Sequence, residues 1–360
     1  MSAVELTWLA CDLKSGRIAE ELQSLSPSGT FGRRLGLPTS AQFDLALDGA
    51  PPDWEAATDP GRTMIVPVDN ATSQPLGAWI TLTREGGSDS TVKLGTSTPE
   101  CYLDRRYTSN YVGVGKDQAV IMTGVANSLT VDAPPFVFDA PATGRTMDYD
   151  VQDGDDRTIL SAWQELMGME GGPEWTVDVE WADAAQTAVR LVARIRPQVG
   201  VQADQPEAAF DFPGCIAAYR CTESYEAGKG ANAVYAWGDG EGASRLHSDS
   251  YLASDLIAAG WCRWVYRYTP ASGLTDPVQL NRHAAEALAQ MRTGTTTWTV
   301  DAVASQAPRL GRDWALGDAV RVQIDRSPRH SQGVSTVARV YGWDFDPAAD
   351  RVTPILLQED

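Results

Sequence analysis

The clearest pattern of apolar and polar positions lies between Gly171 and Trp181, where the chain reads GGPEWTVDVEW. Apolar residues occupy every second position from Trp175 onward, with Thr, Asp and Glu between them. Successive side chains of a strand point to opposite faces, so this pattern predicts a strand with one apolar and one acidic face. Residues 187–196 alternate apolar side chains with arginines. We therefore expect a hairpin in which the acids of one strand face the arginines of the other.

Further alternating patterns predict β-rich regions near both ends of the chain. The strands expected from these patterns are 6–11, 17–22, 42–47, 63–68, 78–83, 91–94, 210 onward, 233–237, 320–324, 337–345 and 351–357. The turns 12–16, 84–89 and 346–350, rich in Gly, Asp and Pro, join three of the pairs into expected hairpins.

Helical spacing interrupts these strands in the middle of the chain. The expected helices are 118–129 with Asp117 as N-cap, 156–169, 251–259 preceded by Asp249, and 277–291 with Asp276 as N-cap and Pro277 at the first helical position. The whole pattern predicts a fold that is mainly β with α+β insertions.

Composition sets the class of protein. A chain of 360 residues exceeds one ordinary core, so we expect two or three domains. No apolar run approaches the roughly 20 residues that cross a bilayer. The N-terminus shows no basic region followed by a hydrophobic stretch, which favours folding in a cytoplasm. The five cysteines are scattered and odd in number, so we expect buried free thiols in place of disulfides or zinc.

The charge is strongly acidic, with 48 Asp and Glu against 29 Lys and Arg and a net charge of −19. Tight binding to nucleic acid is therefore not expected, since each phosphate contact needs a cation. An acidic protein can still lie beside nucleic acid without adhering to it.

Two glycine-rich segments resemble phosphate-binding loops only in part. At 113–117 the chain reads GVGKD, where a P-loop requires an earlier Gly at the position of Asn110 and a hydroxyl at the position of Asp117. At 228–233 it reads GKGANA, but a strand and not a helix is expected to follow. Neither segment predicts a nucleotide site.

Candidate metal ligands are similarly incomplete. The acids between Asp148 and Asp156 do not have the spacing of a calcium-binding loop, so we interpret them as an acidic linker that caps the next helix. The histidines His247, His283 and His330 lie far apart, which does not favour zinc, and we expect His283 at the surface or at a boundary. We predict no catalytic, cofactor-binding or metal-binding residues.

Two other functions remain open at this point. A hydrolase of cell walls or polysaccharides would need a pair of carboxylates, whose separation the sequence does not give, and a cleft containing a carboxyl of raised pKa. A carbohydrate-binding module would expose aromatic side chains, whereas most of the 12 tryptophans lie in strand or helix stripes that favour packing. No GxSxG motif is present.

Several segments together resemble the tail hub, or minor tail, proteins of long-tailed phages that infect actinobacteria. They occur in the order of that family. The segments are Tyr102–Leu103–Asp104–Arg105–Arg106, GGPEWTVDVEW at 171–181, ANAVYAWGDGEG at 231–242, WALGDAV at 314–320 and RVYGWDFDPAADRV at 339–352.

The resemblance implies a structural protein of the virion, a homotrimer at the tail tip. Each protomer would contribute two tail-tube-like β-barrel domains, so that three protomers form a ring of six. The expected units are 1–115 as an N-terminal barrel, 116–170 as an α+β lateral element, and 171–360 as a second barrel with a helical insertion around 245–292. We expect no added cell-wall-cleaving domain.

The same resemblance implies the partners: the distal tail protein, the tape measure protein and central spike or tail fibre proteins, with DNA passing through during ejection. The hub of a contractile injection system would have nearly the same fold and is an alternative. Because a channel that passes DNA should repel phosphate, we hypothesise that part of the excess acid lines the bore.

Overall fold

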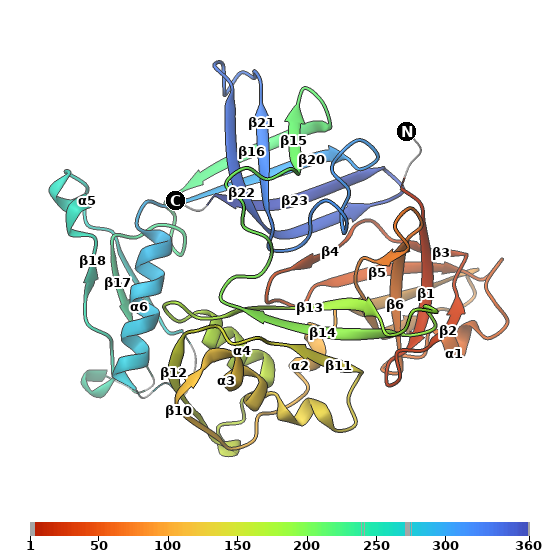
Figure 1. The fold of residues 1–360 in the computed structure, drawn as a ribbon, viewed down its shortest axis with the longest axis horizontal. Coiled ribbons are helices and arrows are strands. Elements are labelled where there is room, and N and C mark those ends of the chain that lie inside the picture. Colours follow the sequence, from red (N-terminus) through yellow and green to blue (C-terminus); the bar gives the residue numbers. More distant parts are fainter. Residues whose placement is uncertain (1–3, 239, 241, 271–273, 275, 359–360) are drawn as a thin grey trace.

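The computed structural model describes residues 4–358 apart from 239, 241, 271–273 and 275. Strands make up 43% of the chain and helices 16%. Figure 1 shows two large sheets beside each other, a layer of helices and short strands below them, and a smaller unit at one end of the longest axis. The predicted class, mainly β with α+β insertions, is confirmed.

The first large sheet comes from the first hundred residues and has eight strands in the order β2-β1-β6-β8-β9-β5-β3, with β7 beside β6. Its strands are β1 (Leu6–Asp12), β2 (Ile18–Glu21), β3 (Leu25–Pro27), β5 (Ser40–Ala46), β6 (Thr63–Asp69), β7 (Gln74–Pro75), β8 (Trp79–Glu85) and β9 (Thr91–Ser97), and the short helices are α1 (Trp54–Ala57) and α2 (Glu100–Leu103). The predicted hairpins β1–β2 and β8–β9 are confirmed as antiparallel pairs.

The second large sheet has seven strands in the order β15-β21-β22-β23-β20-β16, with β4 beside β22. The strands are β4 (Phe31–Arg34), β15 (Ala209–Phe212), β16 (Ile216–Ser224), β20 (Thr295–Val303), β21 (Ala319–Ile324), β22 (Val334–Asp346) and β23 (Arg351–Gln358). Val320, Val322 and Ile324 alternate inward and are buried, as the sequence pattern predicts. The predicted hairpin of β22 and β23 is also confirmed.

One strand of the second sheet comes from the sequence of the first. β4 lies between β3 and β5 in the chain, yet it pairs with β22 so that Phe31 is opposite Phe345. The backbones approach so closely that a Cβ at Gly32 would lie 2.1 Å from the carbonyl oxygen of Trp343. Buried side chains of both sheets accordingly form one continuous core.

Below the sheets lies a layer of helices and short strands. Its elements are β10 (Tyr111–Asp117), α3 (Gln118–Val125), η1 (Asn127–Thr130), β11 (Phe136–Asp139), β12 (Thr146–Val151), η2 (Asp153–Asp155), α4 (Ile159–Met167), β13 (Glu174–Trp181) and β14 (Val189–Arg196). Asp117 caps α3 as predicted, because its carboxylate accepts the amide of Ala119 at 2.9 Å. A second core joins this layer to the outer face of the first sheet.

The hairpin of β13 and β14 forms as predicted but lies elsewhere in the fold. The sequence predicts residues 171–196 as part of the second β-rich unit, whereas in the structure β14 pairs in parallel with β11. The apolar face of β13 packs against α4, where Trp175 lies 5.0 Å from Trp163 between ring centroids. The apolar stripe of an amphipathic helix must pack against another apolar surface, and the apolar face of β13 provides that surface for α4. The limits of the three units stay a prediction.

The insertion, which we define as residues 225–294, separates β16 from β20. It contains β17 (Ala233–Ala236), η3 (Gly242–Ser244), β18 (Tyr251–Leu252), α5 (Ser254–Ala258), β19 (Val265–Tyr268) and α6 (Pro277–Met291). Asp276 caps α6 as predicted, through the amide of Val278 at 2.9 Å. The predicted helix at 251–259 is only partly right: its first two residues pair with β17 as β18. Asp249 does not cap it, because its backbone amide and carboxylate bond the side chain of Asn281.

Candidate assembly interface

Phe31 is the centre of the core that joins the two large sheets. Its side chain is 1% exposed. Edge-on aromatic contacts surround it from both sheets, namely Trp8 and Trp79 of the first and Trp343 and Phe345 of the second. The ring centroids of Phe31 and Trp79 lie 5.1 Å apart at 89°. Such pairs add about 1 kcal/mol each beyond the area they bury, so Phe31 contributes strongly to the coupling of the two sheets.

We call the junction at which β4 joins the two large sheets the seam. The next residues of β4, Arg33 and Arg34, stabilise it through charged contacts. Arg33 is buried and lies 2.9 Å from Asp178 and 3.7 Å from Glu100. It also donates to the hydroxyl of Thr176 at 2.8 Å. Burial raises the pKa of Glu100, and the Arg33 guanidinium opposes that shift. Because a buried charge without a partner is very costly, this arginine fixes β4 against β13.

Arg34 points the other way along the same strand and clamps the second sheet. It forms a bidentate pair with Asp344 of β22, at 2.9 and 2.8 Å. Arg339, also on β22, pairs with Glu174 of β13 and donates to the carbonyl of Val199 at 2.9 Å. Charged hydrogen bonds and ion pairs therefore connect the second sheet, which includes β4, with α2 and the lower layer at one place.

The acids of GGPEWTVDVEW are neutralised within the chain. As predicted, they lie across from arginines: Glu180 contacts Arg190 at 2.8 Å, and Asp178 contacts the Arg194 Nε at 2.7 Å. Arg194 also contacts Asp139 of β11, so the parallel strand joins the same ladder. This ladder does not contribute free negative charge to the surface.

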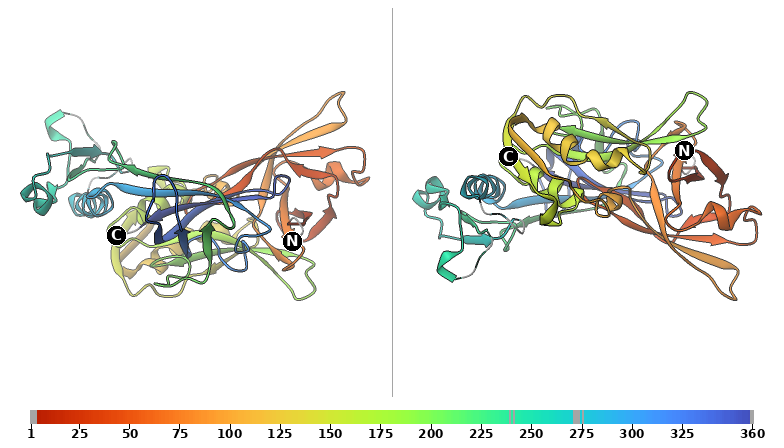
Figure 2. Two further views of the ribbon diagram at one scale, coloured as in Figure 1. Left: turned by 90° about the horizontal axis from the view of Figure 1, so that it is seen from above. Right: turned by 90° about the horizontal axis from the view of Figure 1, so that it is seen from below.

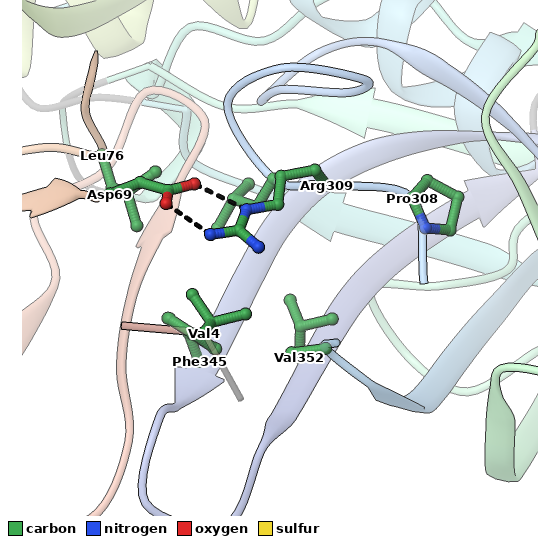
Figure 3. A pocket seen from close by; sticks show the side chains of 9 residues that line it. Val4, Asp69, Leu76, Pro308, Arg309, Phe345 and Val352 are labelled. Atoms are coloured by element: carbon green, nitrogen blue, oxygen red, sulfur yellow. Dashed lines mark hydrogen bonds and ion pairs between the residues drawn. The ribbon is translucent and has the colours of Figure 1, made fainter. Parts of the chain in front are cut away.

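A second tie between the sheets closes a small cavity (Figure 3). The carboxylate of Asp69, at the end of β6, accepts from the Nε of Arg309 at 2.6 Å and from its Nη2. The cavity beside the pair measures about 10 Å³ and is lined by Val4, Leu76, Phe345 and other apolar side chains. That volume holds one water at most, so the site is a joint between sheets and not a ligand pocket.

In the structure, the surroundings of both glycine-rich segments argue against phosphate binding. Gly113–Lys116 belongs to β10, and Asp117 uses its carboxylate to cap α3 and to accept the amide of Gly144 at 2.9 Å. Gly228 and Gly230 form a turn that leads into β17, with no helix after it. Neither segment presents a row of amides at a helix start.

The acidic linker differs from its prediction. Asp148 and Asp150 lie on β12, and Asp155 caps the short η2 by accepting the amide of Gln152 at 2.9 Å. The N-cap of α4 is Thr158, which accepts the amide of Ser161 at 3.1 Å. The linker therefore does not cap the helix, because Asp156 adopts a left-handed conformation that turns the chain before it. Within the described part of the chain, no group of three candidate metal ligands converges.

His283 is not at the surface, which corrects the sequence expectation. It is 2% exposed and lies on the inner face of α6, where its Nδ1 donates to the carbonyl of Gly168 at 2.9 Å. Burial lowers its pKa to about 4 from an ordinary value of 6.5. The buried face of α6 thus includes the contact that docks the insertion on the end of α4. The other two histidines, His247 and His330, lie in different parts of the fold.

The cysteines carry no shared site. Cys11 and Cys215 are buried, Cys101 and Cys221 partly buried, and Cys262 exposed, all as free thiols. Burial raises the pKa of the Cys11 thiol to about 12, so this group stays protonated and unreactive. Of the helices that the structure describes, none has the length and apolar character required to cross a bilayer.

Among the surface grooves that the described residues line, two have volumes well above those of the others. One of about 710 Å³ lies between the β1–β2 turn and Tyr102, and an exposed Lys14–Asp132 pair spans it. The other, of about 490 Å³, lies between β12 and the start of α6 and includes Glu165. Burial raises the pKa of Glu165, although Arg157 and the Tyr149 hydroxyl contact its carboxylate. The side chain of Glu165 is 1% exposed, so it faces a groove without being open to it.

Known proteins give a fold and not a close relative. No family model and no curated protein matches the sequence. The tail protein from Neisseria meningitidis MC58 is 14% identical, with a TM-score of 0.60 over 100% of this chain and 97% of its own. The 43 kDa tail protein of prophage MuSo2 from Shewanella oneidensis is 10% identical, with a TM-score of 0.58 over 98% of each chain. This chain has the tail-protein fold.

A third similar structure is a chain of the Francisella PdpA–VgrG complex. It is 8% identical, with a TM-score of 0.55 over 99% of this chain and 58% of its own. At identities this low, the structural likeness establishes the tail-protein fold and nothing more.

Sequence reasoning missed the residues that hold this tail-protein fold together. Arg33, Arg34 and Asp69 contact partners that are between 67 and 310 positions away along the chain. Only a local signal could have found them, and FGRR at 31–34 is too short to show a strand period. Its two adjacent arginines, one for each side of the strand, are the single hint.

Proposed function

We propose that this chain is a structural hub protein of a phage-type tail, three copies of which form a ring at the tail tip. The single observation that carries the proposal is the pair of large sheets fused over one core by β4. Two tube-like units in each chain allow three chains to present six, and so to join a six-fold tube to a three-fold spike or fibre. Full-length likeness to tail proteins supports the same assignment.

The rigid seam suits this role. A hub must transmit load between the tube and the spike without its two units moving apart, and the Phe31 cluster with the Asp69–Arg309 pair resists such motion. The proposed partners are the distal tail protein, the tape measure protein and the spike or fibre proteins, with DNA passing through the bore. The tail tip of a virion is the proposed location. The similar structures lend no support to an actinobacterial host.

The test is the mass of the purified protein in solution. Light scattering coupled to size exclusion should give three times the mass of a 38.8 kDa chain over a wide range of concentration. Cryo-electron microscopy of the same sample should show a ring with an open centre. A protein that stays monomeric at every concentration, alone and with its tail partners, would refute the proposal.

The lining of the bore is a separate hypothesis. The five acids Asp148, Asp150, Asp153, Asp155 and Asp156 are exposed, and the described residues form no ion pair with them. If part of the excess negative charge faces the bore, DNA will pass without adhering. The ring map tests this directly, because a bore lined by arginines would contradict it.

One observation favours a second candidate, a hydrolase. Glu165 is a carboxyl of raised pKa beside a groove, as such an enzyme requires. Against this, one of its oxygens contacts both Arg157 and the Tyr149 hydroxyl. Zymography on host cell walls with the wild type and Glu165→Gln decides: we expect no clearing with either, and clearing that the substitution abolishes would establish the enzyme.

The likeness to the Francisella VgrG complex favours the hub of a contractile injection system as a variant of the first proposal. The two readings predict different neighbours. A contractile system requires a sheath protein around the tube, whereas a long flexible tail lacks one. A sheath gene beside the gene for this chain would select the injection system.

A further inference from the structure

The insertion carries a positively charged face on an otherwise acidic protein. Its sheet has the order β18-β17-β19, and one side is covered by α6 through Val234, Tyr251 and Tyr266. The register puts Tyr235 opposite Arg267, and Ala233 between Leu252 and Val265, on the other side. We call that other side the outer face, and its exposed members are Leu252, Arg263, Val265 and Arg267.

Arginines and aromatic rings alternate across the outer face. The Arg267 guanidinium lies over the rings of Tyr235 and Trp237, at 5.5 and 5.7 Å from their centroids, and Arg245 lies over Trp237 at 5.6 Å. Arg263 donates to the Tyr235 hydroxyl at 2.9 Å. Stacking holds these cations in place without neutralising them.

These arginines have no acidic partner within the described part of the chain. The described ion pairs of the insertion are Lys229–Glu226 and Arg292–Asp255, and neither includes Arg263 or Arg267. Asp239 and Glu241 of the ANAVYAWGDGEG segment lie outside the described residues. Val265, which lies between Arg263 and Arg267 in the sequence, is 51% exposed, so the outer face combines these cations with exposed apolar area. Such a surface fits an acidic partner that also offers apolar contact.

The opposite end of the molecule has the complementary character. Figure 1 places α5 and β18 at one end of the longest axis and α1 and β2 at the other, and Figure 2 shows the same separation from above and below. Exposed acids gather on the loops around α1 and on the β8–β9 turn. They are Asp48, Asp53, Glu55, Glu85 and Asp89, and no described ion pair involves any of them.

We propose that the outer face binds the acidic α1 end of a second copy of this chain. Unlike surfaces at opposite ends of one protomer form a heterologous contact, which closes into a ring when the rotation between copies allows it. The contact rests on the proposed ring and specifies what holds neighbouring protomers together at its periphery. Arg263 and Arg267 would face Asp53 and Glu55 of the neighbour, with Val265 packed between.

The test is a charge swap. Arg263→Glu with Arg267→Glu should weaken self-association at least tenfold in sedimentation equilibrium, and Asp53→Arg with Glu55→Arg should do the same. All four substitutions together should restore association to within threefold of the wild type. Arg326→Glu, at an exposed arginine in the loop between β21 and β22, is the matched control and should change nothing. Circular dichroism should be unchanged in each variant, since all these side chains are exposed.

The outcomes separate this contact from the proposed ring. A wild type that forms trimers while both double variants form equally stable trimers would overturn the contact and leave the ring standing. A wild type that never associates would overturn both. Variants that keep the trimer but lose binding of a labelled dT oligonucleotide would make the outer face a nucleic-acid site, and this too would overturn the proposal.

Discussion

The seam between the large sheets and the insertion use their aromatic and arginine side chains in opposite ways. At the seam, Phe31 and its aromatic neighbours are fully buried, and Arg33 is enclosed with Asp178 and Glu100. In the insertion, the exposed Arg267 lies over Tyr235 and Trp237, the exposed Arg263 donates to the Tyr235 hydroxyl, and neither forms an ion pair among the described residues. The same residue types therefore form a buried joint at the seam and an exposed surface in the insertion.

The difference in core size explains the contrast. The shared core of the two sheets contains many large side chains, whereas the insertion core consists mainly of Ala, Val and Leu between short strands and α6. A small unit buries too little apolar area to be stable alone. The insertion therefore depends on α6 and on its dock at Gly168, and its outer face can be reserved for a partner.

The largest effect is expected from Phe31→Ala. Removing this ring leaves a cavity between both sheets and should lower the free energy of unfolding by about 4 kcal/mol. Urea denaturation should show both sheets unfolding in one transition, because they share the core. Val265→Ala in the insertion is the control, with an expected change below about 0.5 kcal/mol. Separate unfolding transitions for the two sheets would contradict the shared core.

Arg33→Met should come next, at about 3 kcal/mol, because it leaves Glu100 buried without its cation. Adding Glu100→Gln should recover part of the loss, since the uncompensated charge is then gone. Arg34→Met should cost less, because both members of its pair are 29% exposed and water screens them. Equal losses for Arg33 and Arg34 would show that burial does not set the strength of the seam.

The dock of the insertion should respond to pH. The pKa of His283 is lowered to about 4 in the folded protein, so the unfolded state binds the proton more readily between pH 4 and 6.5. Its stabilising contribution is complete above pH 6.5 and is lost as the pH falls toward 4. Between pH 7 and pH 5 the wild type should lose about 2 kcal/mol more than His283→Asn, measured by urea denaturation. Identical losses would contradict a buried neutral histidine.

The smallest effect is expected from Asp276→Ala at the start of α6. Loss of this N-cap should destabilise the insertion by about 1 kcal/mol. Hydrogen exchange should become faster in α6 while the amides of β22 and β23 keep their protection. Equal acceleration in β22 would mean that the insertion and the sheets unfold together, against the contrast drawn above.

Local patterns predicted much of the fold. The alternation in Val320, Val322 and Ile324 identified β21, and Asp276 followed by Pro277 identified the start of α6, because both signals depend only on neighbours in sequence. The acid–arginine ladder of β13 and β14 was predicted for the same reason. The actual N-cap of α4 was missed because a row of aspartates masked Thr158.

Long-range partners could not be predicted in this way. Nothing near FGRR indicates that β4 joins β22, and no local pattern indicates that β14 joins β11, because strands of equal apolar character are equally suitable partners. His283 appears on a helix that also carries Arg282 and Asn281, and only the docking of α6 against Gly168 buries it. The outer face likewise depends on three strands meeting, although Arg263 and Arg267 alternate visibly in CRWVYRY.

The pairing of β4 with β22 has a consequence for biosynthesis. Arg34 leaves the ribosome long before Asp344, which lies 310 positions later in the chain. At typical translation speeds this interval lasts on the order of half a minute. Until β22 emerges, Phe31 has neither Trp343 nor Phe345 beside it, so a nascent or prematurely terminated chain cannot present the finished pair of sheets. We therefore expect a chain that ends before β22 to keep an exposed aromatic cluster around Phe31.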